Sequence, residues 1–343
     1  MALASAVLFG ASTPFAKLLL GDGVSPWLLA GILYLGSGVG LSIVQIVRWL
    51  SSARQTEAPL RKADLAWLGL VVLSGGVAGP VLLMLGLART SAASASLLLN
   101  LEGLATMIIA WTVFRENVDR RILAGAGSIL AGAVLLSWQG VWSSAGWGAV
   151  LIAGACLAWG IDNNLTRKLS SADPVQIATV KGLVAGSVNL VLAILAGAHF
   201  PATNTLAAAA CLGFLAYGVS LVLFVFALRY LGSARTGAYF STAPFIGAIL
   251  AVTLLSEPLS MRLGAAAVLM AMGLYLHLVE RHSHTHAHNA AEHEHRHCHD
   301  AHHQHNHGPE DPVGEPHSHL HRHAPLVHSH PHFPDLHHRH GHS

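Results

Sequence analysis

The sequence has few charged residues and few cysteines. Only 10% of its 343 residues are charged, against roughly 25% in a soluble domain, while 53% are hydrophobic. This shortage of charge excludes an ordinary soluble globular protein. The three cysteines, Cys156, Cys211 and Cys298, contain no CxxC pair, which excludes a disulfide framework. A formal net charge of +2 is too small to indicate nucleic acid as a partner.

Long apolar runs follow one another from Met1 to Glu280. Each has about 20 residues, which is enough for a helix to cross a hydrocarbon core of ~30 Å. The first run has no basic segment before it, so we interpret it as a helix rather than a signal peptide. We predict an all-α integral membrane protein with about ten transmembrane helices, at 2–20, 26–50, 64–88, 91–114, 121–140, 146–168, 174–198, 206–230, 233–255 and 261–280.

Lys and Arg are distributed unevenly among the predicted connections. With the N-terminus in the cytoplasm, eleven of them lie at the inside ends, and only Lys17, Arg89 and Arg262 lie at the outside ends. The positive-inside rule therefore predicts a multi-pass protein of the plasma or inner membrane with both termini in the cytoplasm. The lipid bilayer is the expected partner, and the sequence is compatible with a homodimer.

The apolar part contains an internal repeat. Residues 97–121 align with residues 238–262 at an offset of 141, so that Glu116 matches Glu257. Each half has five predicted helices, an odd number, so the halves must cross the membrane in opposite directions. Inverted repeats of this kind are typical of secondary transporters. The predicted organisation is a first repeat, a second repeat and a tail, at 1–140, 146–280 and 281–343.

One short motif with an acidic residue follows the fourth helix of each half. It is FRENV at Phe114–Val118 in the first half and LSEPLS at Leu255–Ser260 in the second. With the two five-helix repeats, they resemble the EamA-type drug/metabolite transporters over Met1 to about Glu280. The segment WGIDNNLTRK (Trp159–Lys168), together with Lys181-Gly182, looks like a subgroup signature of that family. The resemblance implies a ten-helix bundle and a secondary carrier, commonly an exporter of amino acids, other metabolites or drugs.

Three ionisable residues lie inside predicted helices, where a charge is costly: Glu102, Asp162 and Lys181. Asp162 and Lys181 are at nearly equal depth, roughly 10 Å at 1.5 Å per residue, on consecutive antiparallel helices. We expect them to form a pair, which serves either helix packing or transport. Glu116 and Glu257 stand at helix ends, where a cap or a loop salt bridge is favoured over contact with a substrate.

Glu102 is the stronger candidate for coupling. It lies near the middle of the fourth helix, it has no counterpart in the second repeat, where Ala243 aligns, and no cation is expected at its depth. Removal from water favours the protonated form of a carboxyl group, so we expect Glu102 to bind and release a coupling proton. Asn100, Asn163 and Asn164 add hydrogen-bonding groups nearby, either for a polar substrate or for contacts between helices.

The tail, residues 281–343, holds 23 of the 25 histidines and few large apolar residues. This composition predicts disorder. The histidines alternate along the chain, so that i and i+2 imidazoles face the same way when it is extended, and neutral imidazoles suit zinc, nickel, cobalt and copper. We predict that the tail binds such divalent ions through His282, His284, His286, His288, His293, His295, His297, Cys298, His299, His303, His305, His307, His317, His319, His321 and His323.

Three functions remain open. The first is a proton-coupled exporter of a small polar metabolite or drug, whose tail stores metal or gates transport. The second is a transporter of divalent zinc, nickel or cobalt, whose tail collects the ion. The third is a membrane-anchored metal sensor or buffer. The apolar part has only His199 and His277 and no paired His and Asp, which disfavours metal as cargo. It contains no nucleophile–base constellation, so we expect no enzyme and no required cofactor.

Overall fold

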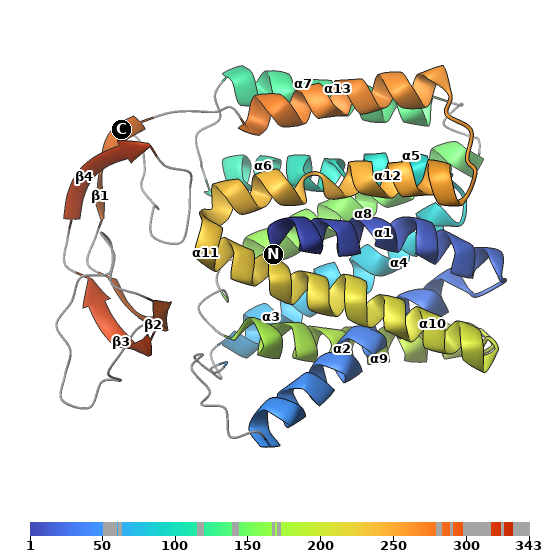
Figure 1. Cartoon of the computed structure of the whole chain (residues 1–343), viewed down its shortest axis with the longest axis horizontal. Helices are drawn as coiled ribbons and strands as arrows, with labels where there is room; N and C mark the ends of the chain where they lie inside the picture. The colour runs from blue at the N-terminus through green and yellow to red at the C-terminus, as the bar shows by residue number, and fades with distance from the viewer. Residues whose placement is uncertain are drawn as a thin grey trace.

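The computed structural model describes residues 1–50, 60, 64–114, 120–138, 144–166, 169, 173–278, 283–288, 291–297, 317–323 and 326–331. The helical elements are α1 (Ala2–Gly21), α2 (Pro26–Leu50), α3 (Leu65–Val71), η2 (Val72–Ala78), α4 (Gly79–Leu87), α5 (Ala92–Leu98), α6 (Leu101–Phe114), α7 (Arg120–Ser137), α8 (Ser144–Thr166), α9 (Pro174–Leu195), α10 (Thr203–Gly213), η3 (Phe214–Val219), α11 (Ser220–Phe240), α12 (Ala243–Leu254) and α13 (Met261–Leu278). They form one bundle (Figure 1).

The helices are long enough to span a membrane where hydropathy predicts transmembrane segments. Eight helical stretches are long and apolar enough to cross a bilayer, and two shorter apolar helices, Ala243–Leu254 and Met261–His277, complete the set in the described residues. Large apolar side chains such as Leu73, Val113 and Leu195 are exposed on the outside of the bundle, as expected of a surface that faces lipid. The prediction of an all-α integral membrane protein is therefore confirmed.

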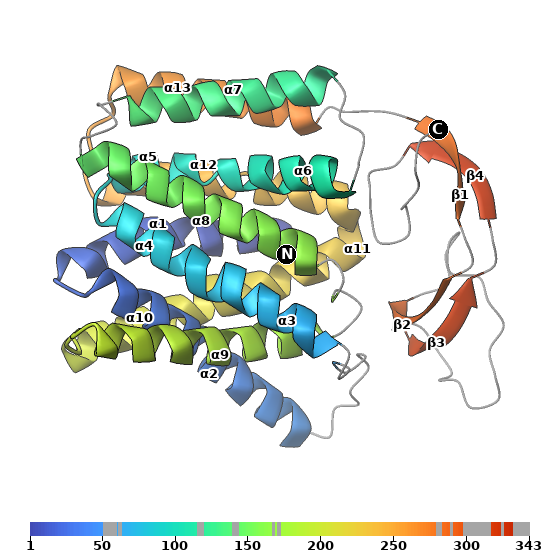
Figure 2. The same ribbon diagram turned by 180° about the vertical axis from the view of Figure 1, so that it is seen from behind.

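The bundle is built from equivalent helix pairs. α6 of the first repeat packs on α8 of the second, and α1 of the first repeat packs on α12 of the second in the matching arrangement. A Cβ atom on Gly160 of α8 would come within 2.9 Å of the Ala105 side chain, and one on Gly10 of α1 would overlap the Ala243 carbonyl oxygen. The absence of a side chain at Gly160 and at Gly10 thus allows the two helices of each pair to approach closely. The view from behind shows α8 between α6 and α4 (Figure 2).

The central helices of the two halves are interrupted at nearly matching positions. Leu99 and Asn100 separate α5 from α6, and Ser241 and Thr242 separate α11 from α12. At the offset of 141, Asn100 aligns with Ser241. The structure differs from the prediction near residue 231, where a loop was expected and the backbone of α11 stays helical to Phe240. A stretch without proline can bend and remain helical when neighbouring helices pack against it.

Two π-helical turns also occupy equivalent places. η2 lies within the third span and η3 within the eighth, and residues 72–78 shifted by 141 become 213–219. A π-turn leaves main-chain groups without regular helical partners, and such turns are frequent at functional sites. In η2 the Gly75 oxygen accepts hydrogen bonds from Tyr34 Oη at 2.8 Å and Trp159 Nε1 at 2.9 Å. Asn189 Nδ2 donates to the Gly76 oxygen at 3.1 Å.

Four short segments of the tail have extended backbone in the described residues. These form the strands β1 (Ser283–His288), β2 (Ala291–His297), β3 (His317–His323) and β4 (Leu326–Pro331). β1 pairs with β4 and β2 with β3, both antiparallel. The physical reason is the alternation already noted, because a period of two is compatible with extended backbone. Backbone register sets His293 opposite His321 and His295 opposite His319.

Candidate functional site

Glu102 lies in the first turn of α6, directly after the interruption of the central helix. Asn163 Nδ2, on α8, donates a hydrogen bond to Glu102 Oε1 at 2.9 Å and lies 3.3 Å from Thr106 Oγ1. Glu102 is half-buried and Asn163 is exposed. Sequence predicts Glu102 and Asn163 separately, and the packing of α6 on α8 brings them together.

Asp162 and Lys181 form the predicted ion pair, from α8 and α9. Both side chains are buried, with 7% and 12% of their surface exposed. Thr166 Oγ1 donates a further hydrogen bond to Asp162 Oδ1 at 3.2 Å. The carboxylate occupies the space beside Gly75 in η2, where a Cβ atom would overlap it. The pair therefore joins α8 and α9 directly beside the π-turn of the third span.

The two remaining asparagines make contacts within the scaffold. Asn164 Nδ2 bridges α8 to α6, since it donates to the Thr106 oxygen at 3.1 Å and the Gly160 oxygen at 2.8 Å. Asn100 Nδ2 donates to the Leu97 oxygen at 2.8 Å, which closes the turn between α5 and α6. These bonds support the interpretation that Asn100 and Asn164 hold helices, while Asn163 is the amide beside the carboxylate.

Aromatic side chains from several helices meet beside this polar group. Phe9 of α1 contacts Trp159, Tyr217 and Phe240, with ring centroids 6.4, 6.0 and 5.4 Å apart. Tyr217 of η3 also lies 5.3 Å from Tyr34 of α2. Sequence reasoning missed this aromatic cluster as a candidate site. The repeat held one signal for it, because Phe9-Gly10 and Trp159-Gly160 are similar dipeptides in the two halves.

Glu257 acts as a helix cap, as predicted. Its Oε1 accepts a hydrogen bond from the Ala92 amide at 2.7 Å, and its Oε2 accepts one from the Ala93 amide at 2.8 Å. These amides begin α5, where main-chain N–H groups lack helical partners. The matching residue of the first repeat, Glu116, lies outside the described residues.

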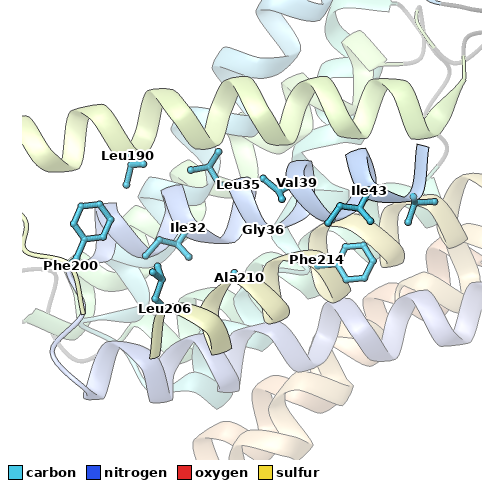
Figure 3. A pocket seen from close by; sticks show the side chains of 12 residues that line it. Ile32, Leu35, Gly36, Val39, Ile43, Leu190, Phe200, Leu206, Ala210 and Phe214 are labelled. Atoms are coloured by element: carbon cyan, nitrogen blue, oxygen red, sulfur yellow. The ribbon is translucent and has the colours of Figure 1, made fainter. Parts of the chain in front are cut away.

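An apolar groove lies on the outer side of α2, between α9 and α10 (Figure 3). Its volume is about 530 Å³, and the side chains that line it are all hydrocarbon, among them Ile32, Phe200, Leu206 and Phe214. A site for a polar solute needs a few well-placed polar groups. The groove provides none from its lining side chains, so the polar group around Glu102 remains the candidate site.

The predicted metal ligands from His282 to His323, with Cys298, lie outside the residues whose side chains the structure describes. Within the part that it does describe, no group of three or more His, Cys, Asp or Glu side chains is arranged to hold a metal ion. In the bundle, His277 Nε2 lies 3.0 Å from the Ile122 carbonyl oxygen. This contact joins α13 to α7.

The fold and the polar group inside it define a multi-pass membrane transporter. The model of the EamA-like transporter family matches residues 1–138 and 146–279. The chain therefore belongs to the EamA-like transporter family. This confirms the resemblance found in the sequence. Since members of the family are transporters, the prediction that the chain is no enzyme agrees with its membership.

Several relatives share most of this length. An "Uncharacterized transporter" of Methanothermobacter thermautotrophicus is 28% identical over 287 residues, which are 80% of this chain and 83% of the relative. The "Uncharacterized inner membrane transporter YedA" of Escherichia coli K12 is 24% identical over 74% of this chain and 85% of its own. A solved crystal structure has the same fold, with a TM-score of 0.59 and 19% identity over 80% of this chain and 98% of the other.

A shorter relative matches one part of the chain. The "Probable 4-amino-4-deoxy-L-arabinose-phosphoundecaprenol flippase subunit ArnE" of Pseudomonas paraeruginosa is 36% identical over 112 residues. The match covers 33% of this chain and 95% of that relative. A subunit of that size corresponds to about one repeat of the present chain.

Proposed function

We propose that the protein is a proton-coupled secondary transporter that exports a small polar metabolite or drug across the plasma or inner membrane, with both termini in the cytoplasm. Glu102 is the coupling residue in this proposal. The observation that carries it is a carboxylate at the interruption of a central helix, hydrogen-bonded to the neutral amide of Asn163. Ionisable groups inside a membrane protein commonly mark proton or substrate pathways.

Glu102 has a neutral hydrogen-bond partner. Asn163 donates a hydrogen bond to its carboxylate, and a neutral amide does not compensate the charge of the carboxylate. Among the described residues, Lys181 is already paired with Asp162 and does not neutralise Glu102 directly. A proton and a substrate with a donor group can therefore compete for the same carboxylate, which is a basis for exchange.

The neighbouring groups take supporting roles in the proposal. The aromatic cluster around Phe9 supplies an apolar wall beside the carboxylate, against which the hydrocarbon part of a substrate can pack. The Asp162–Lys181 pair positions α8, and thereby Asn163, against α9 and η2. A substrate with one polar donor and a compact apolar body fits these groups best.

The test is transport by purified protein in liposomes. A panel of amino acids, amino sugars and cationic drugs is screened for accumulation driven by a pH gradient. The amino sugars are included because one relative is a probable 4-amino-4-deoxy-L-arabinose-phosphoundecaprenol flippase subunit. The variant Glu102→Gln keeps the hydrogen bond and cannot lose a proton, so it is expected to abolish gradient-driven accumulation. Thr112→Ala is a matched control in the same helix, since Thr112 Oγ1 donates to the Ile108 oxygen of α6 itself. Unchanged pH dependence in Glu102→Gln contradicts the proposal.

For the tail we propose binding of divalent transition metals, on the strength of its 23 histidines. The tail then stores metal or gates export. If metal is instead the cargo, the tail collects the ion at the inner mouth, and if no flux exists the chain is a metal sensor or buffer. Deleting residues 282–343 distinguishes the exporter, the metal transporter and the metal sensor from one another. Metal flux that persists and responds to Glu102 favours metal cargo, metabolite flux alone favours the exporter, and absence of both favours the sensor.

A further inference from the structure

We propose that Lys17 and Glu257 form a latch that closes the end of the bundle opposite the tail and must open during each transport cycle. The inference rests on the transport function proposed above. Lys17 comes from the first repeat and Glu257 from the second, and both bind the main chain of the connection between α4 and α5. In Figure 1 this connection lies at the right of the bundle, and the tail lies at the left.

Glu257 binds one side of the connection with both of its carboxylate oxygens. The bonds to the Ala92 and Ala93 amides are 2.7 and 2.8 Å long, and a charged acceptor makes each stronger than a neutral one. The carboxylate also lies at the positive end of the α5 dipole. The end of α12 is thereby fixed to the start of α5.

Lys17 binds the other side of the connection. Its Nζ donates to the Leu87 oxygen at 2.6 Å and to the Thr90 oxygen at 2.8 Å. The Leu87 oxygen is at the end of α4, where carbonyl groups have no helical donor. A cation from α1 and an anion from the chain after α12 thus hold one short connection from both sides.

The backbone before Glu257 is held in an uncommon conformation. Ser256 has a φ of 54°, and no other non-glycine residue in the described part of the chain has a positive φ. This left-handed conformation is costly for a residue with a side chain. It ends α12 and turns the chain so that Glu257 points back to α5. A conformation of this cost is retained when it positions a functional group, and here that group is the carboxylate of the latch.

The latch joins the elements that an exporter has to separate. α5 and α6 form the interrupted central helix that carries Glu102, and α12 is its counterpart in the other repeat. Alternating access requires the two repeats to move relative to each other around the central site. At this end, Lys17 and Glu257 connect them through the α4–α5 connection, so exposure of Glu102 to this side requires these bonds to break.

Accessibility of a buried position behind the latch tests the inference without any substrate. Ser96 is 1% exposed and lies one turn into α5, and Ser96→Cys is nearly isosteric. The measurement is its labelling rate by a membrane-impermeant maleimide in liposomes, in a background that lacks Cys156, Cys211 and Cys298. Labelling is expected to be slow in the parent and about tenfold faster in Lys17→Met and in Glu257→Gln, because each loses charge-assisted bonds.

The control variant removes a charge at the same end without affecting the latch. Arg89 lies in the α4–α5 connection, is exposed, and its Nη1 donates to the Leu85 oxygen of α4 rather than to Lys17 or Glu257, so Arg89→Gln should label like the parent. Lys17→Arg, which keeps the cation, should also label slowly. Equal labelling in the latch variants and Arg89→Gln overturns the proposal, and so does fast labelling in the parent.

Hydrogen exchange of the unmodified protein serves if a latch variant fails to fold. The Ala92 and Ala93 amides should exchange faster than those of the buried residues Ile32 and Leu33 inside α2, since the latch opens and the α2 core does not. Equal protection shows a permanent cap and overturns the proposal. Neither measurement involves protons at Glu102, so failure of the latch and failure of the coupling proposal are separate results.

Discussion

Replacing Lys181 by methionine will destabilise the bundle by more than replacing both members of its ion pair. The single change leaves the Asp162 carboxylate buried, with Thr166 Oγ1 at 3.2 Å as the hydrogen-bond donor that remains. Asp162 is 5% exposed, so water cannot substitute for the lost ammonium group. Breaking a buried pair in this way costs about 3–5 kcal/mol, which is a factor of about 10²–10⁴ in the folding equilibrium.

The double variant Asp162→Asn with Lys181→Met removes both charges. Replacing a whole buried pair by neutral groups is often close to neutral for stability, so the double variant should recover most of the loss. The assay is thermal unfolding of the purified proteins in detergent, with Glu102→Gln as a control that alters a carboxylate outside the pair. If Lys181→Met and the double variant unfold at the same temperature, the pair does not stabilise the fold as argued. A stable double variant without transport assigns the pair to function.

Other predictions follow from contacts of η2 and from the tail. Gly75→Ala adds a Cβ atom that overlaps the Asp162 carboxylate and should lower the free energy of unfolding by about 1–3 kcal/mol. The control Gly69→Ala adds a Cβ atom that meets nothing within 4 Å and should be neutral. Thermal unfolding compares the two variants. Trp159→Phe and Tyr34→Phe each remove one donor to the Gly75 oxygen and should each cost about 0.5–1.5 kcal/mol, with a larger combined loss in the double variant. Deleting residues 282–343 should abolish Ni²⁺ binding in equilibrium dialysis and leave the unfolding temperature unchanged; retained binding contradicts the tail as the metal site.

Hydropathy and loop spacing were sufficient for much of the fold. Apolar length predicts the spans because each helix must satisfy its own main-chain hydrogen bonds in lipid. The equal depth of Asp162 and Lys181 predicts their pairing, and the position of Glu257 at a helix end predicts its cap. These predictions need only residue spacing along helices and the antiparallel order of neighbours.

Other features depend on contacts that spacing does not encode. The π-turns η2 and η3 lie inside long apolar runs, where hydropathy predicts the length of a span and not the type of helix. The aromatic cluster is assembled from α1, α2, α8, η3 and α11, whose mutual approach is decided by packing. The helical backbone of α11 through the expected loop reflects bending within a packed bundle, and the short strands of the tail reflect pairing between segments far apart in sequence.

The asymmetry between Glu102 and Ala243 has a consequence for the charge balance of transport. A transporter built from two identical single-repeat subunits in antiparallel orientation would have two such carboxylates. This chain has one, because Ala243 stands at the matching position. With the coupling role proposed for Glu102, one cycle returns one proton through this position. Exchange of that proton for a neutral solute moves net charge across the membrane, and exchange for a monovalent cation moves none. The dependence of flux on membrane voltage would therefore report the charge of the unidentified substrate.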